Sequence, residues 1–146
     1  MALPSQPASP APPGAAPQAA LPGARAALLL LLTINLFNYI DRYVLAAVLP
    51  KLEAQFAPND PNAKAKMGLL TTAFMVAYMV LAPLFGWLGD RTSRWLLVGI
   101  GVILWSLATG ASGFATGFLM LLLTRCCVGI GEAAYGPVAP GVISDL

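Results

Sequence analysis

Residues 86–95, with the sequence GWLGDRTSRW, decide the fold that we expect for this chain. The charges in this stretch, Asp90, Arg91 and Arg94, separate two uncharged segments, residues 67–89 and residues 95–124. A membrane-spanning helix needs about 20 mostly apolar residues, and both segments are that long. The stretch is therefore predicted to be a short charged turn between two membrane helices.

The composition of the whole chain supports a membrane protein. Of its 146 residues, 58% are hydrophobic and only 10% are charged, whereas a soluble domain carries about 25% charged residues. Most of the surface must then face an apolar partner, and we expect that partner to be the lipid bilayer. The formal net charge is only +2, which gives no sign of nucleic-acid binding.

Few residues of this chain suit catalysis or metal binding. There is no histidine, and the two cysteines, Cys126 and Cys127, are adjacent within an apolar segment. Adjacent cysteines rarely satisfy disulfide geometry, and the spaced ligands of a zinc site are missing from the sequence. We interpret both cysteines as packing residues, and we expect no metal, no cofactor and no enzymatic activity.

Residues 1–24 differ from the rest of the chain. This segment has seven prolines and no charged residue, so it cannot form a core and is predicted to be a disordered tail. A cleaved secretory leader is the alternative interpretation. It is disfavoured because the apolar segment after Arg25 continues past the length of a normal leader.

The remainder, residues 25–146, is predicted to be all-α with four transmembrane helices, at about residues 26–49, 67–87, 95–110 and 118–143. Pro50 is expected to end the first helix, and the glycine-rich residues 110–117 separate the third from the fourth. Residues 51–66 form a polar loop. Basic residues do not fix the orientation, because three lie on each side (Arg25, Arg91 and Arg94 against Lys51, Lys64 and Lys66).

Four ionisable residues fall inside the predicted helices: Asp41, Arg42, Arg125 and Glu132. Such residues cost several kcal/mol in hydrocarbon unless they are paired or hydrated, so they usually mark a functional site facing a cavity. A structural ion pair that joins two helices is the alternative. Asp41 and Arg42 lie roughly 22 Å into the first helix, and Arg125 lies roughly 12 Å into the antiparallel fourth. In a core about 30 Å thick these depths nearly coincide, which favours pairing.

Glu132 lies seven residues after Arg125 and therefore on the same helix face. A protonatable carboxylate near an arginine at this depth suits proton coupling. We predict that Glu132→Gln abolishes pH-driven uptake without preventing membrane insertion.

Several of these motifs resemble one family, the major facilitator superfamily of transporters. Gly86, Leu88, Asp90, Arg91 and Arg94 match its signature for the loop between the second and third helices, although Ser93 replaces a glycine and Trp95 a basic residue. Residues 125–134 (RCCVGIGEAA) resemble its fourth-helix pattern, in which Gly129 and Gly131 permit close helix packing. With residues 38–42 (NYIDR) and residues 78–86 (YMVLAPLFG), the chain looks like the spinster branch.

The resemblance implies both a fold and a set of roles. It implies the N-terminal portion of a twelve-helix transporter in the cell membrane (the inner membrane if bacterial), with a cytoplasmic tail. The spinster branch is associated with export of sphingosine phosphate and lysophospholipids, which implies an amphipathic anionic substrate moved by alternating access, with protons as the coupling ion. Asp41, Arg42, Arg125 and Glu132 would line the central cavity, and Arg42 or Arg125 would bind the anionic head group. Asp90, Arg91 and Arg94 would form a cytoplasmic latch.

The chain is short for such a transporter, since members of the superfamily have two six-helix halves. We therefore expect an N-terminal piece that needs the remaining helices of the same transporter. The alternatives are a small four-helix multidrug exporter acting as a dimer and a non-transporting membrane scaffold. The exporter interpretation explains neither the loop signature nor a glutamate in the fourth helix, and the scaffold leaves the intramembrane charges unexplained.

Overall fold

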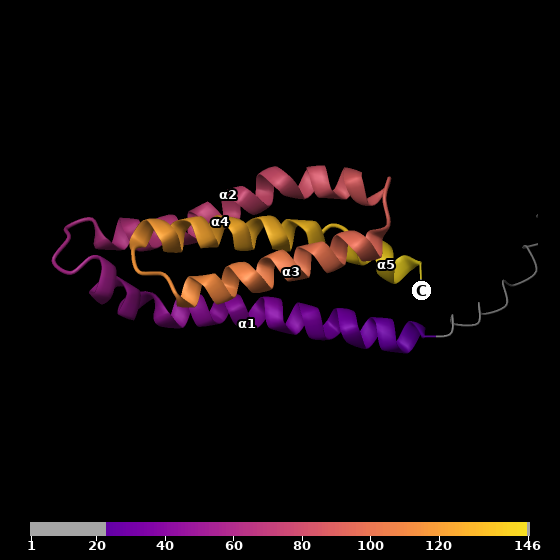
Figure 1. Ribbon diagram of the computed structural model, residues 1–146, viewed down its shortest axis with the longest axis horizontal. Helices are drawn as coiled ribbons and strands as arrows, with labels where there is room; N and C mark the ends of the chain where they lie inside the picture. Colours follow the sequence, from indigo (N-terminus) through magenta and orange to yellow (C-terminus); the bar gives the residue numbers. More distant parts are fainter. Residues whose placement is uncertain (1–22, 146) are drawn as a thin grey trace, which may run out of the picture.

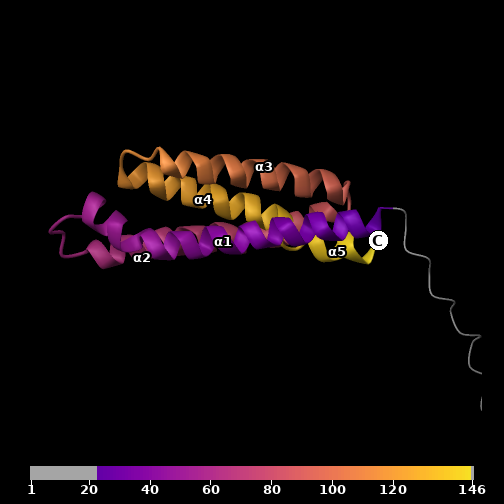
Figure 2. The ribbon, with the colours of Figure 1, turned by 90° about the horizontal axis from the view of Figure 1, so that it is seen from below.

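The computed structural model describes residues 23–145, and these form five α-helices: α1 (Ala24–Phe56), α2 (Ala63–Gly89), α3 (Arg94–Gly113), α4 (Phe118–Tyr135) and α5 (Ala139–Ser144). The helices run nearly side by side (Figure 1). α4 packs closely against both α2 and α3, whereas α1 lies along the bundle with fewer close backbone approaches. Figure 2 shows α3 and α4 as one layer and α1 and α2 as the other.

Four segments are long and apolar enough to cross a membrane: Ala24–Phe56, Ala63–Gly89, Arg94–Gly113 and Phe118–Ser144. The prediction of an all-α membrane protein with four transmembrane helices is confirmed. We call the end of the bundle that holds the start of α3 and helix α5 the Arg94 end. The other end, with the connection between α1 and α2, is the Asp60 end (Figure 1).

The first helix does not end at Pro50, as the sequence had suggested, but continues to Phe56. A proline inside a helix costs about 3 kcal/mol. The extra turns place Leu52 and Phe56, beside Leu49, against the buried cluster of Met67, Leu70 and Leu121. Burying each large apolar side chain contributes roughly 1.5–3 kcal/mol, so this packing offsets the cost of the proline.

The fourth transmembrane segment is also not one uninterrupted helix. A turn at residues 136–138 separates α4 from α5. Pro137 has no backbone N–H to continue the helix, and Pro140 lies in the first turn of α5, where proline is tolerated. The third helix extends to Gly113 rather than ending at residue 110. Residues 1–22, which include nearly all of the predicted disordered tail, lie outside the described residues.

Two glycines allow α4 to approach its neighbours closely. A Cβ atom on Gly131 would lie 2.6 Å from the backbone nitrogen of Trp105 and 2.8 Å from the carbonyl oxygen of Gly101, both on α3. A Cβ atom on Gly129 would lie 2.5 Å from the carbonyl oxygen of Phe74 on α2. Small residues are needed where helix backbones come this close.

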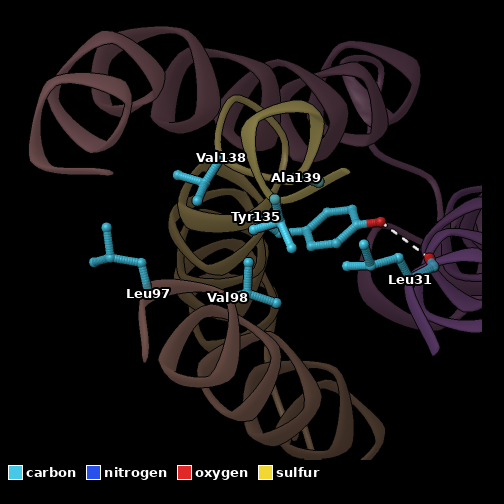
Figure 3. Packing of buried hydrophobic residues seen from close by; sticks show 7 residues of the cluster. Leu31, Leu97, Val98, Tyr135, Val138 and Ala139 are labelled. Atoms are coloured by element: carbon cyan, nitrogen blue, oxygen red, sulfur yellow. Dashed lines mark hydrogen bonds between the residues drawn. The ribbon is translucent and has the colours of Figure 1, made fainter. Parts of the chain in front are cut away.

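An apolar cluster joins four of the helices at the Arg94 end (Figure 3). Leu97 and Val98 of α3 pack against Tyr135 of α4 and Val138 of the following turn. The Tyr135 hydroxyl donates a hydrogen bond of 3.1 Å to the backbone carbonyl of Leu31, as Figure 3 shows. This bond fixes α1 to α4 on the Arg94 side of the intramembrane charges.

Candidate functional site

The four intramembrane charges form two ion pairs between α1 and α4. Arg42 Nη2 lies 2.6 Å from Glu132 Oε2. Arg125 Nη1 lies 3.6 Å from Asp41 Oδ2. Neighbouring residues on α1 are therefore paired with residues seven positions apart on α4.

The antiparallel direction of α1 and α4 explains this pairing (Figure 1). Arg125 and Glu132 are two turns apart, or roughly 10 Å along the axis. Side chains on a helix incline towards its N-terminus, so Arg42 extends along α1 towards the Arg94 end, where Glu132 lies. The short side chain of Asp41 stays level with Arg125. Adjacent residues can thus reach two separated partners.

The two arginines differ strongly in exposure. The side chain of Arg125 is 6% exposed, whereas that of Arg42 is 48% exposed. Arg125 Nη2 also donates a hydrogen bond of 2.6 Å to Ser112 Oγ on α3, and Ser112 Oγ lies 2.9 Å from Thr124 Oγ1. Arg125 therefore joins α1, α3 and α4 and has little freedom to contact a ligand.

Arg42 has more accessible surroundings. Its guanidinium lies over the ring of Phe74 on α2, with 5.3 Å between the guanidinium carbon and the ring centroid. A cation at this distance from an aromatic face is attracted by the ring quadrupole. Arg42 is thus held between Glu132 and Phe74 while half of its side chain stays exposed.

A cavity of about 460 Å³ opens beside Arg42 between α1 and α2. Its apolar wall is formed mainly by aliphatic, aromatic and methionine side chains, and its charged groups are Asp41, Arg42 and Arg125. This volume falls within the range of small-molecule sites, about 300–1,000 Å³. Apolar walls with charges gathered at one place suit a ligand that has an apolar chain and a charged head.

A second group of charges lies at the Arg94 end. Arg94 Nη1 donates hydrogen bonds to the carbonyl oxygen of Gly141 at 2.9 Å and to Asp145 Oδ2 at 2.8 Å. Arg94 Nη2 lies 3.5 Å from Asp90 Oδ1. The guanidinium of Arg91 lies over the ring of Trp87, at 4.1 Å from its centroid. The residues 86–95 turn is thereby attached to the end of the fourth transmembrane segment.

The sequence analysis did not identify several of these partners. Asp145 was not predicted as a partner of Arg94. An acidic residue at the end of a helix that lies on the same membrane side as a basic loop could have indicated this contact. Ser112 and Phe74 carried no signal, because a serine in a glycine-rich break and a phenylalanine in an apolar span are common. Asn38, which is 7% exposed, had been quoted only as part of a motif.

Comparison with known protein families now decides the identity of the fold. The profile described as Major Facilitator Superfamily matches residues 31–146. The chain belongs to the major facilitator superfamily. No solved structure matches the chain.

Spinster proteins are among the curated relatives of this superfamily member. It is 50% identical over 115 residues to Protein spinster homolog 1 of Homo sapiens. This alignment covers 77% of the chain and 21% of the relative. It is 45% identical over 121 residues to Protein spinster homolog 1 of Xenopus laevis, covering 82% and 22%. It is 44% identical over 114 residues to the Sphingosine-1-phosphate transporter SPNS2 of Danio rerio, covering 77% and 22%. The chain spans about a fifth of the length of these relatives.

These findings confirm the predicted resemblance to the major facilitator superfamily and its spinster proteins, and they agree with the expectation that the chain is not an enzyme. They give no support to a small four-helix multidrug exporter.

Proposed function

We propose that the full-length protein carrying this segment is a proton-coupled transporter that moves an amphipathic anionic lipid by alternating access. The substrate class is lysophospholipid or sphingosine phosphate. The observation that carries the proposal is the apolar cavity of about 460 Å³ with an accessible arginine at its wall. The similarity to a protein named as a sphingosine-1-phosphate transporter supports the lipid class.

Arg42, rather than Arg125, is the residue that binds the anionic head group. A guanidinium offers paired donors that match a phosphate. Arg42 is half-exposed beside the cavity, whereas the two terminal nitrogens of the buried Arg125 are directed at Ser112 and Asp41. Arg125 instead holds α1, α3 and α4 in register behind the site.

The pairing of Arg42 with Glu132 links substrate to proton. A phosphate that binds Arg42 competes with Glu132 for the same donors. Glu132 is 1% exposed, and a buried carboxylate without a counter-charge is so costly that it takes up a proton instead. Substrate binding and protonation of Glu132 thus favour each other.

The charges at the Arg94 end act as a latch in this proposal, and this end faces the cytoplasm. Arg94 holds the residues 86–95 turn against the end of the fourth segment through Asp145. Asp90 pairs with Arg94, and Arg91 lies over Trp87 within the turn. These contacts must rearrange for the transporter to open at the Arg94 end. When they form, they favour the state that is closed at this end.

The experiment is lipid uptake by the full-length protein in proteoliposomes, with and without a pH gradient. Arg42→Gln is expected to reduce uptake of a lysolipid phosphate about tenfold or more, since a charge-assisted hydrogen bond is lost. Arg42→Lys is expected to be intermediate, because lysine keeps the charge but not the bidentate geometry. Lys64→Gln, which removes an exposed charge at the Asp60 end, is the charge-matched control. Uptake by the unaltered protein that ignores the pH gradient would contradict proton coupling.

A further inference from the structure

The two intramembrane carboxylates line different cavities. Asp41 lines the cavity of about 460 Å³ described above. Glu132 does not line that cavity, and lines instead a smaller one of about 130 Å³ on the Arg94 side of the ion pairs. Arg42 and Tyr78 line both cavities and lie between them.

The smaller cavity, which we call the chamber, has a polar lining. Asn35, Asn38 and Arg42 come from α1, Tyr78 comes from α2, and Glu132 and Tyr135 come from α4. Its volume is enough for about four water molecules at roughly 30 Å³ each. Amide, hydroxyl and carboxylate groups provide the several polar partners that a buried water needs.

One atom of Glu132 points to a ligand in the chamber. Glu132 Oε2 accepts the hydrogen bond from Arg42, whereas Oε1 is buried and makes no well-formed hydrogen bond among the described residues, although the Asn38 side chain lies close to the carboxylate. The side chain is 1% exposed. A buried carboxylate oxygen without a protein partner is normally satisfied by water.

The chamber continues towards the Arg94 end. A groove of about 490 Å³ shares Asn35, Tyr135 and Gly136 with the chamber, and it extends along α1 to Leu28 and along α5 to Ile143. Both of these residues lie within the last turns of the bundle at that end. The groove is lined mainly by apolar side chains, and it connects the chamber to the Arg94 end without passing through the large cavity.

We propose that this chamber is a hydrated proton-entry site that supplies Glu132 from the Arg94 end, with Asn38 positioning its water. The proposal rests on the proton coupling proposed above. A proton carried by water in the groove passes along the chamber to Glu132 Oε1, which becomes a neutral carboxylic acid, and the Arg42 guanidinium stays protonated throughout. Arg42, released from Glu132, is then free to bind the anion in the large cavity.

The charged and titratable groups around Glu132 are consistent with this role. α1 contributes Tyr39, Asp41 and Arg42, and α2 contributes Tyr78. α4 contributes Arg125 and Tyr135, whereas residues 95–113 of α3 include no charged side chain. Glu132 is therefore the only carboxylate of the described residues that lines the chamber.

Sided cysteine modification of the full-length protein tests the route. Asn35→Cys is introduced after Cys126 and Cys127 are replaced by serine, in vesicles of known orientation. A membrane-impermeant methanethiosulfonate should modify Asn35→Cys much faster from the Arg94 side than from the Asp60 side. Thr71→Cys, which lines the large cavity, is the matched control and should be modified from the Asp60 side. Equal rates from both sides at Asn35→Cys, or faster modification from the Asp60 side, would overturn the proposal.

A second variant tests the role of Asn38. Asn38→Leu should reduce pH-driven uptake about tenfold, the effect of losing the hydrogen bond that positions the water, while lipid counterflow without a pH gradient stays near that of the unaltered protein. An equal loss of both activities would show a merely structural role and would overturn the proposal. The two proposals can fail separately. If the unaltered protein transports lipid independently of the pH gradient while Asn35→Cys is still modified from the Arg94 side, proton coupling is contradicted but the aqueous route is supported.

Discussion

At the scale of single residues, the two arginines of the site have separate tasks because they differ in burial. Arg125 is enclosed by Ser112 and Asp41, and Arg42 is half-exposed beside the cavity. Sequence spacing places the two arginines at nearly the same depth in the membrane. It does not distinguish their roles, because depth along a helix does not show which side chains of α3 lie nearby. The hydrogen bond to Ser112 on α3 holds Arg125 in place and has no counterpart at Arg42. Ser112 also bonds Thr124, which is twelve positions away in the chain.

Removal of Arg42 should make stability depend on pH. Arg42→Gln leaves the buried Glu132 without its half-exposed partner at neutral pH, and leaving a buried acceptor unsatisfied costs about 1–3 kcal/mol. Protonation of Glu132 removes the unpaired charge, so the loss of stability should be largest at pH 8 and smaller at pH 5. Thermal unfolding of the purified full-length protein at both pH values measures this. Glu132→Gln combined with Arg42→Gln is the control, and it should show no such difference between the two pH values.

At the scale of helices, close packing of α4 is the main constraint. Glycine spacing in residues 125–134 predicted close contact, and α4 does approach both α2 and α3. The ends of the helices were less predictable. Pro50 signals a helix end locally, and only the distant cluster around Leu70 and Leu121 explains why α1 continues beyond it.

The close contact between α3 and α4 gives a packing prediction. Gly131→Ala should destabilise the protein by about 1–3 kcal/mol, because a new Cβ atom would meet the backbone of Trp105 and Gly101. Gly99→Ala is the matched control, since no atom lies within 4 Å of its added Cβ. That variant should be neutral or slightly stabilising, because alanine is the better helix former. Denaturation of both variants in detergent measures the difference, and equal effects would contradict the close approach.

The connection between α1 and α2 carries a separate pH dependence. Asp60 accepts hydrogen bonds from the Lys66 ammonium and from the backbone N–H of Asn62, and these hold the pKa of its carboxyl below the ordinary value. A lowered pKa in the folded state stabilises the loop above the ordinary carboxyl pKa, and this contribution is lost as the pH falls through the lowered value. Asp60→Asn should therefore speed hydrogen exchange in residues 57–66 at pH 7, and its effect should shrink as the pH falls below the ordinary carboxyl pKa. A variant that exchanges like the unaltered protein at pH 7 would show that the loop does not depend on this carboxylate.

At the scale of the whole molecule, the contacts at the Arg94 end connect the residues 86–95 turn to the fourth segment. The turn itself was predictable from its charges and its place between apolar segments. The contact with Asp145 was not predictable, because the position of Asp145 depends on the turn between α4 and α5. Pro137 and Pro140 indicate that the helix is interrupted but not the direction in which the chain continues.

Charge reversal tests the latch. Arg94→Asp and Asp145→Arg should each reduce transport by the full-length protein, and the double variant should recover part of the loss, because opposite charges again face each other. Coupling between contacting residues is typically about 0.5–3 kcal/mol in a double-mutant cycle. Uptake rates at equal protein insertion give the coupling. Strictly additive losses would show that the two side chains do not interact during transport.

The link between Arg42 and Glu132 is best tested by one measurement, pH-driven lipid uptake by the full-length Glu132→Gln protein, with lipid counterflow measured in the same vesicles. Glutamine keeps the size of the side chain and one acceptor oxygen but cannot exchange a proton. We expect pH-driven uptake to be abolished while counterflow and membrane insertion persist. Full pH-driven uptake by this variant would contradict the role of Glu132 as the proton-coupling residue.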